Sequence, residues 1–334
     1  MTVITQSQSL TRYGRRYLST CVLLFCGLAS LSQNRTSPPA AFGQSGAPAI
    51  SVQTALVVLP VSVTDMQGNA VSGLSRENFR VYEDGNLQDV TMFQQQDTPV
   101  TVGLIVDHSR SMGSKLPEVA TAVSAFAQSS NPSDELFVVD FNDDVSVELL
   151  GGKAFTHDPS ELVKAVFSVR ARGRTALYDA VAEGLLHVQL GHCDKKALII
   201  VSDGGDNASQ QKLSQVLSLA RQTQVVIYSI GLVGDGDEVD PAALRRLSKA
   251  TGGIAFFPDR MDAVATVSAQ IARDLRELYT LGFSPPKSNK ARAFRKIEVK
   301  VAAPGHGKLH ARTRTGYSVP EEMAMPAEPA KGAK

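Results

Sequence analysis

The sequence predicts an α/β fold, in which a doubly wound, mostly parallel, Rossmann-like sheet is flanked by small β-rich N- and C-terminal segments. Between residues 100 and 257, short apolar runs alternate with segments whose apolar residues recur every three or four positions. Apolar runs without polar alternation are typical of strands buried on both faces, as in a parallel sheet covered by helices. Outside this region, β-branched residues and turn dipeptides replace the helical spacing.

The first folded segment, residues 50–98, is predicted to be a small β module. Its run SVQTALVVLPVSVTD has the β-branched content of a strand. Gly68-Asn69 and Asp84-Gly85 are turn dipeptides that separate further short strands. The module is small for independent folding, because a short segment buries little apolar surface.

The α/β region follows over residues 99–280. Its buried strands are expected at 100–106, 136–139, 197–201, 225–230 and 254–257, with a hairpin partner for the second strand at 145–150. A first helix is expected through Val119 and Val123, and later helices at 159–168, 176–190, 210–222 and 261–277. Asp240 and Pro241 supply an N-cap and a first-turn proline for one more helix.

The β structure is predicted to return near the C-terminus, with a strand at 279–283 and a C-terminal β segment over residues 281–319. Residues 294–301 alternate apolar and charged side chains, as a strand with one buried face does, and 309–313 form a further run. These strands either pair with the N-terminal β module or extend the central sheet. The sequence is compatible with both arrangements.

The two ends of the chain have a different composition. Residues 1–32 are predicted to be a signal peptide or, alternatively, a retained N-terminal anchor, because arginines precede an apolar stretch shorter than the about 18–20 residues of a spanning helix. Residues 33–49 are expected to be a flexible linker and residues 320–334 a disordered tail. We therefore expect an exported protein, periplasmic, envelope-associated or secreted, with no membrane span in the mature chain. Two of the three cysteines lie within residues 1–32 and would be lost with the signal peptide. Only Cys193 would remain, and it is expected to be a small buried apolar side chain.

The charge balance limits the possible partners. Lysine and arginine number 34 against 33 aspartate and glutamate residues, so the formal net charge is +1. Such a chain has no bulk electrostatic attraction to nucleic acid, and the absence of tryptophan also argues against a surface that stacks on bases. Nucleic acid is therefore excluded as a partner.

The residues that carry chemistry follow the buried strands. Asp107, Ser109 and Ser111 come directly after the strand at 100–106, and Asp203 follows the strand at 197–201. Thr175 lies between them, at the start of a predicted helix. Because ligands of open parallel sheets bind beyond the carboxyl ends of the strands, these oxygen donors are expected to meet there. Two carboxylates and three hydroxyls suit Mg²⁺ or Mn²⁺, suit Ca²⁺ less well, and lack the Cys and His spacing of zinc sites.

This ordered set of Asp107, Ser109, Ser111, Thr175 and Asp203 resembles the metal-ion-dependent adhesion site of von Willebrand factor type A domains. The resemblance covers about residues 98–280. It implies that the two serines and the threonine are hydroxyl ligands, and that the two aspartates act partly by orienting waters and hydroxyls. The flanking segments resemble those of exported proteins of this family from Acidobacteria.

One position departs from the family pattern. The motif is often D-x-S-G-S, and here Arg110 stands in place of the glycine. This cation either weakens metal binding or attracts an acidic ligand.

Other polar residues near the motif are interpreted as structural. His108 is expected to be a solvated loop residue. Asp206 and Asn207 are expected to form a turn, as is the cluster at 142–144, which lacks the spacing of an EF-hand. The basic stretch that includes Arg295 and Lys296 is expected to be a solvated strand face.

The resemblance implies a binding module and not an enzyme. In this hypothesis a divalent cation bridges the site to an Asp or Glu of a protein partner. A metal-assisted hydrolase is the alternative from another class, but His108 is its only local candidate for a general base and no G-x-S-x-G or H-E-x-x-H motif is present. An envelope scaffold that needs no metal is the third possibility.

Overall fold

The computed structural model describes residues 56–318, apart from residues 148, 150, 233–239, 261 and 286–293. The predicted signal peptide or anchor, the linker and the tail lie outside these residues. None of the helices in the described part of the chain is both long enough and apolar enough to cross a membrane.

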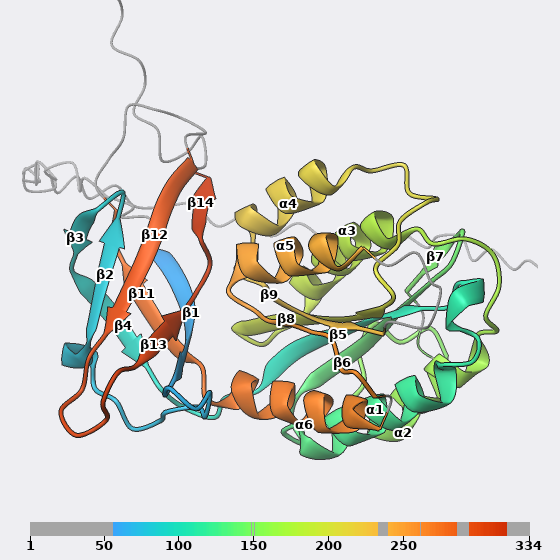
Figure 1. Ribbon diagram of the computed structural model, residues 1–334, viewed down its shortest axis with the longest axis horizontal. Helices are drawn as coiled ribbons and strands as arrows, with labels where there is room; N and C mark the ends of the chain where they lie inside the picture. Colours follow the sequence, from blue (N-terminus) through green and yellow to red (C-terminus); the bar gives the residue numbers. More distant parts are fainter. Residues whose placement is uncertain are drawn as a thin grey trace, which may run out of the picture. The chain divides into compact units, whose positions relative to one another are not determined.

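The predicted α/β region contains a six-stranded sheet with helices on both faces (Figure 1). The strand order is β10-β9-β8-β5-β6-β7, and every neighbouring pair is parallel except the last. The strands are β5 (Val100–Asp107), β6 (Glu135–Phe141), β7 (Val145–Ser146), β8 (Lys195–Ser202), β9 (Val226–Gly231) and β10 (Ala255–Phe256). The predicted fold class is confirmed.

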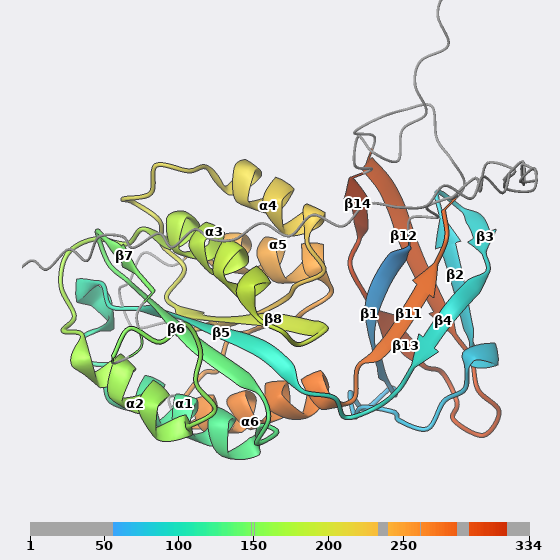
Figure 2. The ribbon, with the colours of Figure 1, turned by 180° about the vertical axis from the view of Figure 1, so that it is seen from behind.

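Two apolar cores lie on the two faces of this sheet. One contains side chains of α1 (Leu116–Ser129), α2 (Pro159–Ser168) and α6 (Ala263–Arg276). The other contains side chains of α3 (Leu177–His187), α4 (Leu213–Gln222) and α5 (Pro241–Thr251), and the turned view of Figure 2 shows the same division. All eight residues of β5 are buried, with Leu104 in the first core and Ile105 in the second. This explains why the strand reads as one uninterrupted apolar run.

The helix limits follow from local sequence signals. α2 has the predicted bounds, and the Asp158 carboxylate before it accepts a hydrogen bond from the backbone of Ser160. α5 begins at Pro241, where Asp240 caps the amides of the first turn as predicted. The predicted hairpin at 145–150 is reduced to two paired residues in β7.

The remaining strands form two four-stranded sheets that share a third apolar core. Their orders are β13-β1-β11-β4 and β14-β12-β2-β3. The strands are β1 (Val57–Thr64), β2 (Phe79–Glu83), β3 (Asn86–Gln88), β4 (Val90–Gln94), β11 (Tyr279–Phe283), β12 (Phe294–Val301), β13 (His310–Arg312) and β14 (Gly316–Ser318). β11 pairs with β1 and β12 pairs with β2, both antiparallel. The C-terminal strands therefore pair with the N-terminal module, which is the first of the two arrangements that the sequence allowed.

A buried ion pair lies within the second of these sheets. Arg295 of β12 donates to both carboxylate oxygens of Glu83 on β2, at 3.0 and 2.9 Å, and the Tyr317 hydroxyl donates to the same carboxylate. Arg295 is only 8% exposed. The expectation of a solvated face at this residue is wrong, because Glu83 supplies the partner that lets a guanidinium be buried.

Polar contacts also connect α6 and β9 to the strands of the β module. The Asp274 carboxylate on α6 accepts hydrogen bonds from Ser62 of β1, Tyr228 of β9 and Arg312 of β13, at 2.6, 2.5 and 2.5 Å. Arg312 also donates to the carbonyl of Gly252, which ends α5. One carboxylate therefore accepts from three elements that are far apart in the sequence.

We expect Arg295→Met to lower the free energy of unfolding by about 3–5 kcal/mol, because the variant leaves the Glu83 carboxylate buried without its cation. Urea denaturation of the full chain, followed by circular dichroism, measures the loss. Arg76→Met is the matched control, since Arg76 pairs with Asp89 at the surface, where the side chains are 49% and 82% exposed. Equal stability of the two variants would contradict a role for the buried pair.

Candidate metal centre

The parallel pairing of β5 and β8 brings the two predicted aspartates to one edge of the sheet. Val106 lies opposite Val201, so each strand ends one residue later, at Asp107 and Ser202. The Ser202 hydroxyl donates to Asp107 Oδ2 at 2.6 Å, and the Ser109 amide donates to Asp107 Oδ1 at 2.8 Å. Burial raises the pKa of Asp107 to about 6, although these donors oppose the effect and the Asp203 charge adds to it.

A chain of hydroxyls links the first motif to Asp203. The Ser109 and Ser111 hydroxyl oxygens are 3.1 Å apart, and the Ser111 hydroxyl donates to Asp203 Oδ2 at 2.5 Å. Ser111 belongs to η2 (Arg110–Met112), which follows β5 directly. Ser109 and Asp203 are buried, whereas Ser111 is exposed. The oxygen cluster therefore opens to the surface on the side of Ser111.

Thr175 lies on a loop that is bonded to both of these segments. Its amide donates to the side chain of Asn207 at 2.9 Å, and the Asn207 amide donates to the Thr175 carbonyl at 3.0 Å. On the other side, the Arg110 amide donates to the carbonyl of Gly173 at 3.3 Å. Gly173 has a φ of +72°, and a Cβ atom there would overlap the Asp143 carboxylate, so this position requires glycine. The structure thus brings all three predicted loops together.

A lysine that the sequence analysis missed lies beside the aspartates. Lys115 is 7% exposed, and its Nζ is 3.9 Å from Asp203 Oδ2 and donates to the Leu232 carbonyl at 3.1 Å. Lys115 precedes Val119 and Val123 at four-residue spacing, so the helical pattern already placed it on the buried face of α1. An ammonium group there contributes positive charge next to one of the two carboxylates.

His108 is not solvated, and that prediction is wrong. Its side chain is fully buried, Nε2 donates to the Val166 carbonyl at 3.0 Å, and Nδ1 lies 3.3 Å from Asp140 Oδ1. Burial lowers the pKa of His108 and raises that of Asp140 to about 7. The ring packs behind the candidate site, because the residue after β5 points inward at the end of a strand that has no exposed face.

The residues that the sequence analysis interpreted as turns lie in loops, with bends at Asn207 and at 142–144. Asp206 accepts hydrogen bonds from the Ser209 hydroxyl at 2.5 Å and the Tyr178 amide at 3.2 Å. The Asn142 side chain accepts from the Asp144 amide at 3.1 Å. These side chains already accept bonds from the loops that surround the site, so they are structural supports.

The donor set fits a hard divalent cation. Two carboxylates and neighbouring hydroxyls supply oxygen alone, which suits Mg²⁺ or Mn²⁺. Within the described part of the chain, no group of three or more His, Cys, Asp and Glu side chains is placed to hold a metal ion. The hydroxyl ligands that the sequence analysis assigns to Ser109, Ser111 and Thr175 stay a prediction.

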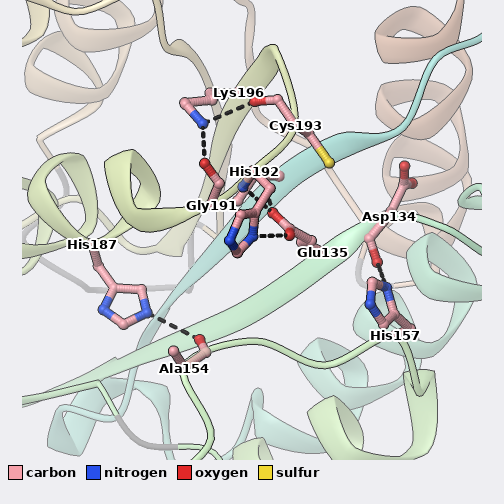
Figure 3. A network of polar contacts seen from close by, with 10 residues as sticks. Asp134, Glu135, Ala154, His157, His187, Gly191, His192, Cys193 and Lys196 are labelled. Carbon is pink, nitrogen blue, oxygen red and sulfur yellow. Dashed lines mark hydrogen bonds and ion pairs between the residues drawn. The ribbon is translucent and has the colours of Figure 1, made fainter.

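A second polar cluster lies around the start of β6, at the other end of the strand from Asp140 (Figure 3). Glu135 accepts from the Thr101 hydroxyl at 2.7 Å, the His192 ring at 2.8 Å and the His192 amide at 2.8 Å. Burial alone would raise the pKa of Glu135, but these donors outweigh it and lower the pKa to about 2. Nearby Cys193 is half-buried and free, and burial raises its thiol pKa, so it is not an activated nucleophile.

The comparison with protein families identifies the α/β region. The family described as von Willebrand factor type A domain matches residues 102–270, which is half of the chain. The protein therefore belongs to this family, and the resemblance carried by the aspartate, serine and threonine motifs is confirmed. No curated protein matches the chain.

Solved structures show similar folds at low sequence identity. A von Willebrand factor type A protein from Catenulispora acidiphila is 13% identical, with a TM-score of 0.49 over 74% of this chain and 75% of that chain. The vWF domain of a type V pili tip protein from Porphyromonas gingivalis is 10% identical, with a TM-score of 0.45 over 53% and 95%. A proximal thread matrix protein from the mussel byssus, with a zinc-occupied MIDAS motif, is 18% identical, with a TM-score of 0.46 over 57% and 48%.

We expect Glu135→Gln to lower the free energy of unfolding by about 2 kcal/mol at pH 7, because the carboxylate is held below its ordinary pKa in the folded state. A lowered folded-state pKa contributes stability above about pH 4.5 that is lost as the pH falls toward about 2. Urea denaturation at a series of pH values should therefore show the two proteins converging in acid. A gap that stays constant with pH would contradict the charge-based explanation, and Glu298→Gln, in the exposed pair with Lys300, is the control.

Proposed function

We propose that this protein is a metal-ion-dependent protein-binding module of the cell envelope or exterior, and not an enzyme. The observation that carries the proposal is the bonded chain from Ser109 through Ser111 to Asp203, with Asp107 beside it and Thr175 on the adjoining loop. A divalent cation bound there supplies an electrophilic centre that accepts one more oxygen ligand. Membership of the family supports this reading, since its domains typically serve adhesion and protein interaction.

Each residue has a separate role in the proposal. The hydroxyls of Ser109, Ser111 and Thr175 would be direct ligands, because they carry no charge and leave the cation electrophilic. Asp107 and Asp203 would balance the charge and orient hydroxyls and waters. Because Asp107 is buried and Ser111 is exposed, the partner would approach from the side of Ser111 and offer the carboxylate of an Asp or Glu.

The environment of His108 weighs against the hydrolase alternative. A general base must be within hydrogen-bond reach of the proton that it removes. Both ring nitrogens of His108 face buried groups, namely carbonyls and Asp140, and the side chain is fully buried. His108 is therefore assigned a packing role behind the site.

Titration calorimetry of the full chain with Mg²⁺ and Mn²⁺ tests the metal site. We expect Asp107→Asn and Ser111→Ala each to weaken binding at least about tenfold, because each removes an oxygen donor or its orienting charge. Asp144→Asn, which changes an exposed carboxylate on a neighbouring turn, should bind like the parent. Unchanged affinity in both site variants, or no binding by the parent chain, would favour the metal-independent scaffold.

Lys115 gives an independent test of the same site. Its ammonium lies 3.9 Å from Asp203 Oδ2 and would repel a cation held by that carboxylate. We therefore expect Lys115→Met to tighten Mg²⁺ binding roughly tenfold in the same calorimetric assay. Weaker binding in this variant would show instead that the contact between Lys115 and the Leu232 carbonyl is needed to shape the site.

A further inference from the structure

The loops around the candidate site carry a group of exposed arginines. Arg110 follows the first ligand position, and Arg170, Arg172 and Arg174 alternate along the segment between α2 and α3. In this segment the arginines are exposed, whereas Ala171 and Gly173 between them are half-buried. The three arginines are therefore the solvent-exposed side chains of this segment. We call Arg110, Arg170 and Arg172 the arginine rim.

Backbone hydrogen bonds fix the arginine rim beside the oxygen cluster. The Arg172 amide donates to the His108 carbonyl at 2.8 Å, and the Arg110 amide donates to the Gly173 carbonyl at 3.3 Å. His108 and Arg110 flank Ser109, so these two bonds hold the Ser109 loop against the segment that ends at Thr175. The arginines are therefore attached to the same backbone that positions the proposed metal ligands.

Within the described part of the chain, the side chains of the rim make no close polar contact, although Arg172 lies near enough to Asp143 to help lower the pKa of that carboxyl group. Among the described residues, the guanidinium groups of Arg110, Arg170 and Arg172 make no hydrogen bond or ion pair. Arg174 is different, since its guanidinium and its amide both donate to the Asp143 carboxylate. Arg174 is therefore excluded from the rim, because its charge is already balanced.

Arg110 also has no conformational reason to be an arginine or a glycine. Among the described non-glycine residues, Asp84 alone has a positive φ, so the backbone at Arg110 is open to any residue. The side chain is exposed, and among the described residues its guanidinium group makes no hydrogen bond or ion pair. The effect of Arg110 is therefore electrostatic, and its charge acts at the exposed side of the candidate site.

The buried charges reinforce this field. Asp107 and Asp203 together balance a divalent cation, and Lys115 adds an ammonium group 3.9 Å from Asp203 Oδ2. The arginine rim adds three exposed cations beside the site, while the chain as a whole is nearly neutral. A concentrated positive face attracts acidic partners and repels basic ones.

We infer that the partner of this module is an acidic protein segment with several carboxylates, one of which meets the metal while neighbouring ones pair with the arginine rim. This inference rests on the proposed function, because it assigns the first carboxylate to the cation. Alternate residues of an extended peptide lie about 7 Å apart on one side, so a peptide with Asp at alternate positions presents several carboxylates to the same surface. Arginine pairs well with carboxylates through its planar fork of donors.

Fluorescence polarisation with three labelled peptides tests the inference on the full chain. In a Gly/Ser background, the first peptide has one Asp, the second has Asp at three alternate positions, and the third has Asn at the same three. In Mg²⁺, we expect the three-Asp peptide to bind about tenfold more tightly than the one-Asp peptide, with two- to threefold from each exposed pair. The Asn peptide should not bind.

The triple variant Arg110→Ser/Arg170→Ser/Arg172→Ser should lose this tenfold advantage while it keeps the one-Asp affinity and the calorimetric Mg²⁺ affinity within about threefold. Its control is a charge-matched variant, Lys249→Ser/Arg273→Ser/Lys308→Ser, which removes three exposed cations on α5, α6 and the β module whose side chains make no ion pair with the described residues. The control should keep the full advantage of the three-Asp peptide.

Failure of the inference is distinguishable from failure of the proposed function. If the rim variant keeps the tenfold advantage, the arginine rim is not the binding surface and the inference is overturned, while metal-dependent binding of the one-Asp peptide still stands. If EDTA and Asp107→Asn leave peptide binding unchanged, the metal-bridged function itself is overturned. If dextran sulfate binds in a rim-dependent way and the three-Asp peptide does not, the surface is for a polyanionic polysaccharide and the inference is wrong.

Discussion

The parallel pairing of β5 with β8 is the interaction on which the candidate site depends. It sets Val106 against Val201 and so places Asp107 beside Ser202 and next to Asp203, although nearly a hundred residues separate them in the chain. A one-residue slip in this register would turn every side chain of the strand to the opposite face. Both faces of β5 belong to apolar cores, so a slip would exchange large side chains between two packed layers. The geometry of the oxygen donors is thus held by packing far from the donors themselves.

The same constraint shows why the strand ends carry the polar residues. All of β5 and the last six residues of β8 are buried, so an unpaired polar group there would be costly. At the carboxyl ends the buried residues become polar, and Asp107, Ser109 and Asp203 are hydrogen-bonded to neighbouring serines and to one another. The backbone then turns sharply at Gly204, which has a φ of +87° and whose Cβ atom would contact the Asp240 carbonyl. The candidate site is therefore formed by the carboxyl end of the sheet itself.

Sequence patterns were sufficient where the structure depends on local signals. The buried strands, the capped helix at Asp240 and the alternating strand β12 each have a period or a cap that is visible in the chain. The convergence of the loops that carry the candidate residues was also predictable, because strand ends in a parallel sheet lie at one edge. The burial of His108 and Arg295 was not, because each bonds to a group from a distant element, the Val166 carbonyl of α2 for His108 and the Glu83 carboxylate of β2 for Arg295. A charged or polar side chain in a short motif carries no information about the partner that will bury it.

Lys115 and the arginine rim carry positive charge in two different environments, one buried and one exposed. The composition of the chain does not distinguish between them. Lys115 is buried against Asp203 and the Leu232 carbonyl, so its cost of burial is offset by specific partners and its charge acts on the oxygen cluster. The rim arginines keep their charge exposed, and their cost in stability is small because they remain in water. Arg110 therefore replaces the family's glycine without straining the backbone. This substitution affects how a ligand approaches the site and does not affect the fold. A chain with a formal net charge of +1 can in this way direct a locally positive face toward one class of partner.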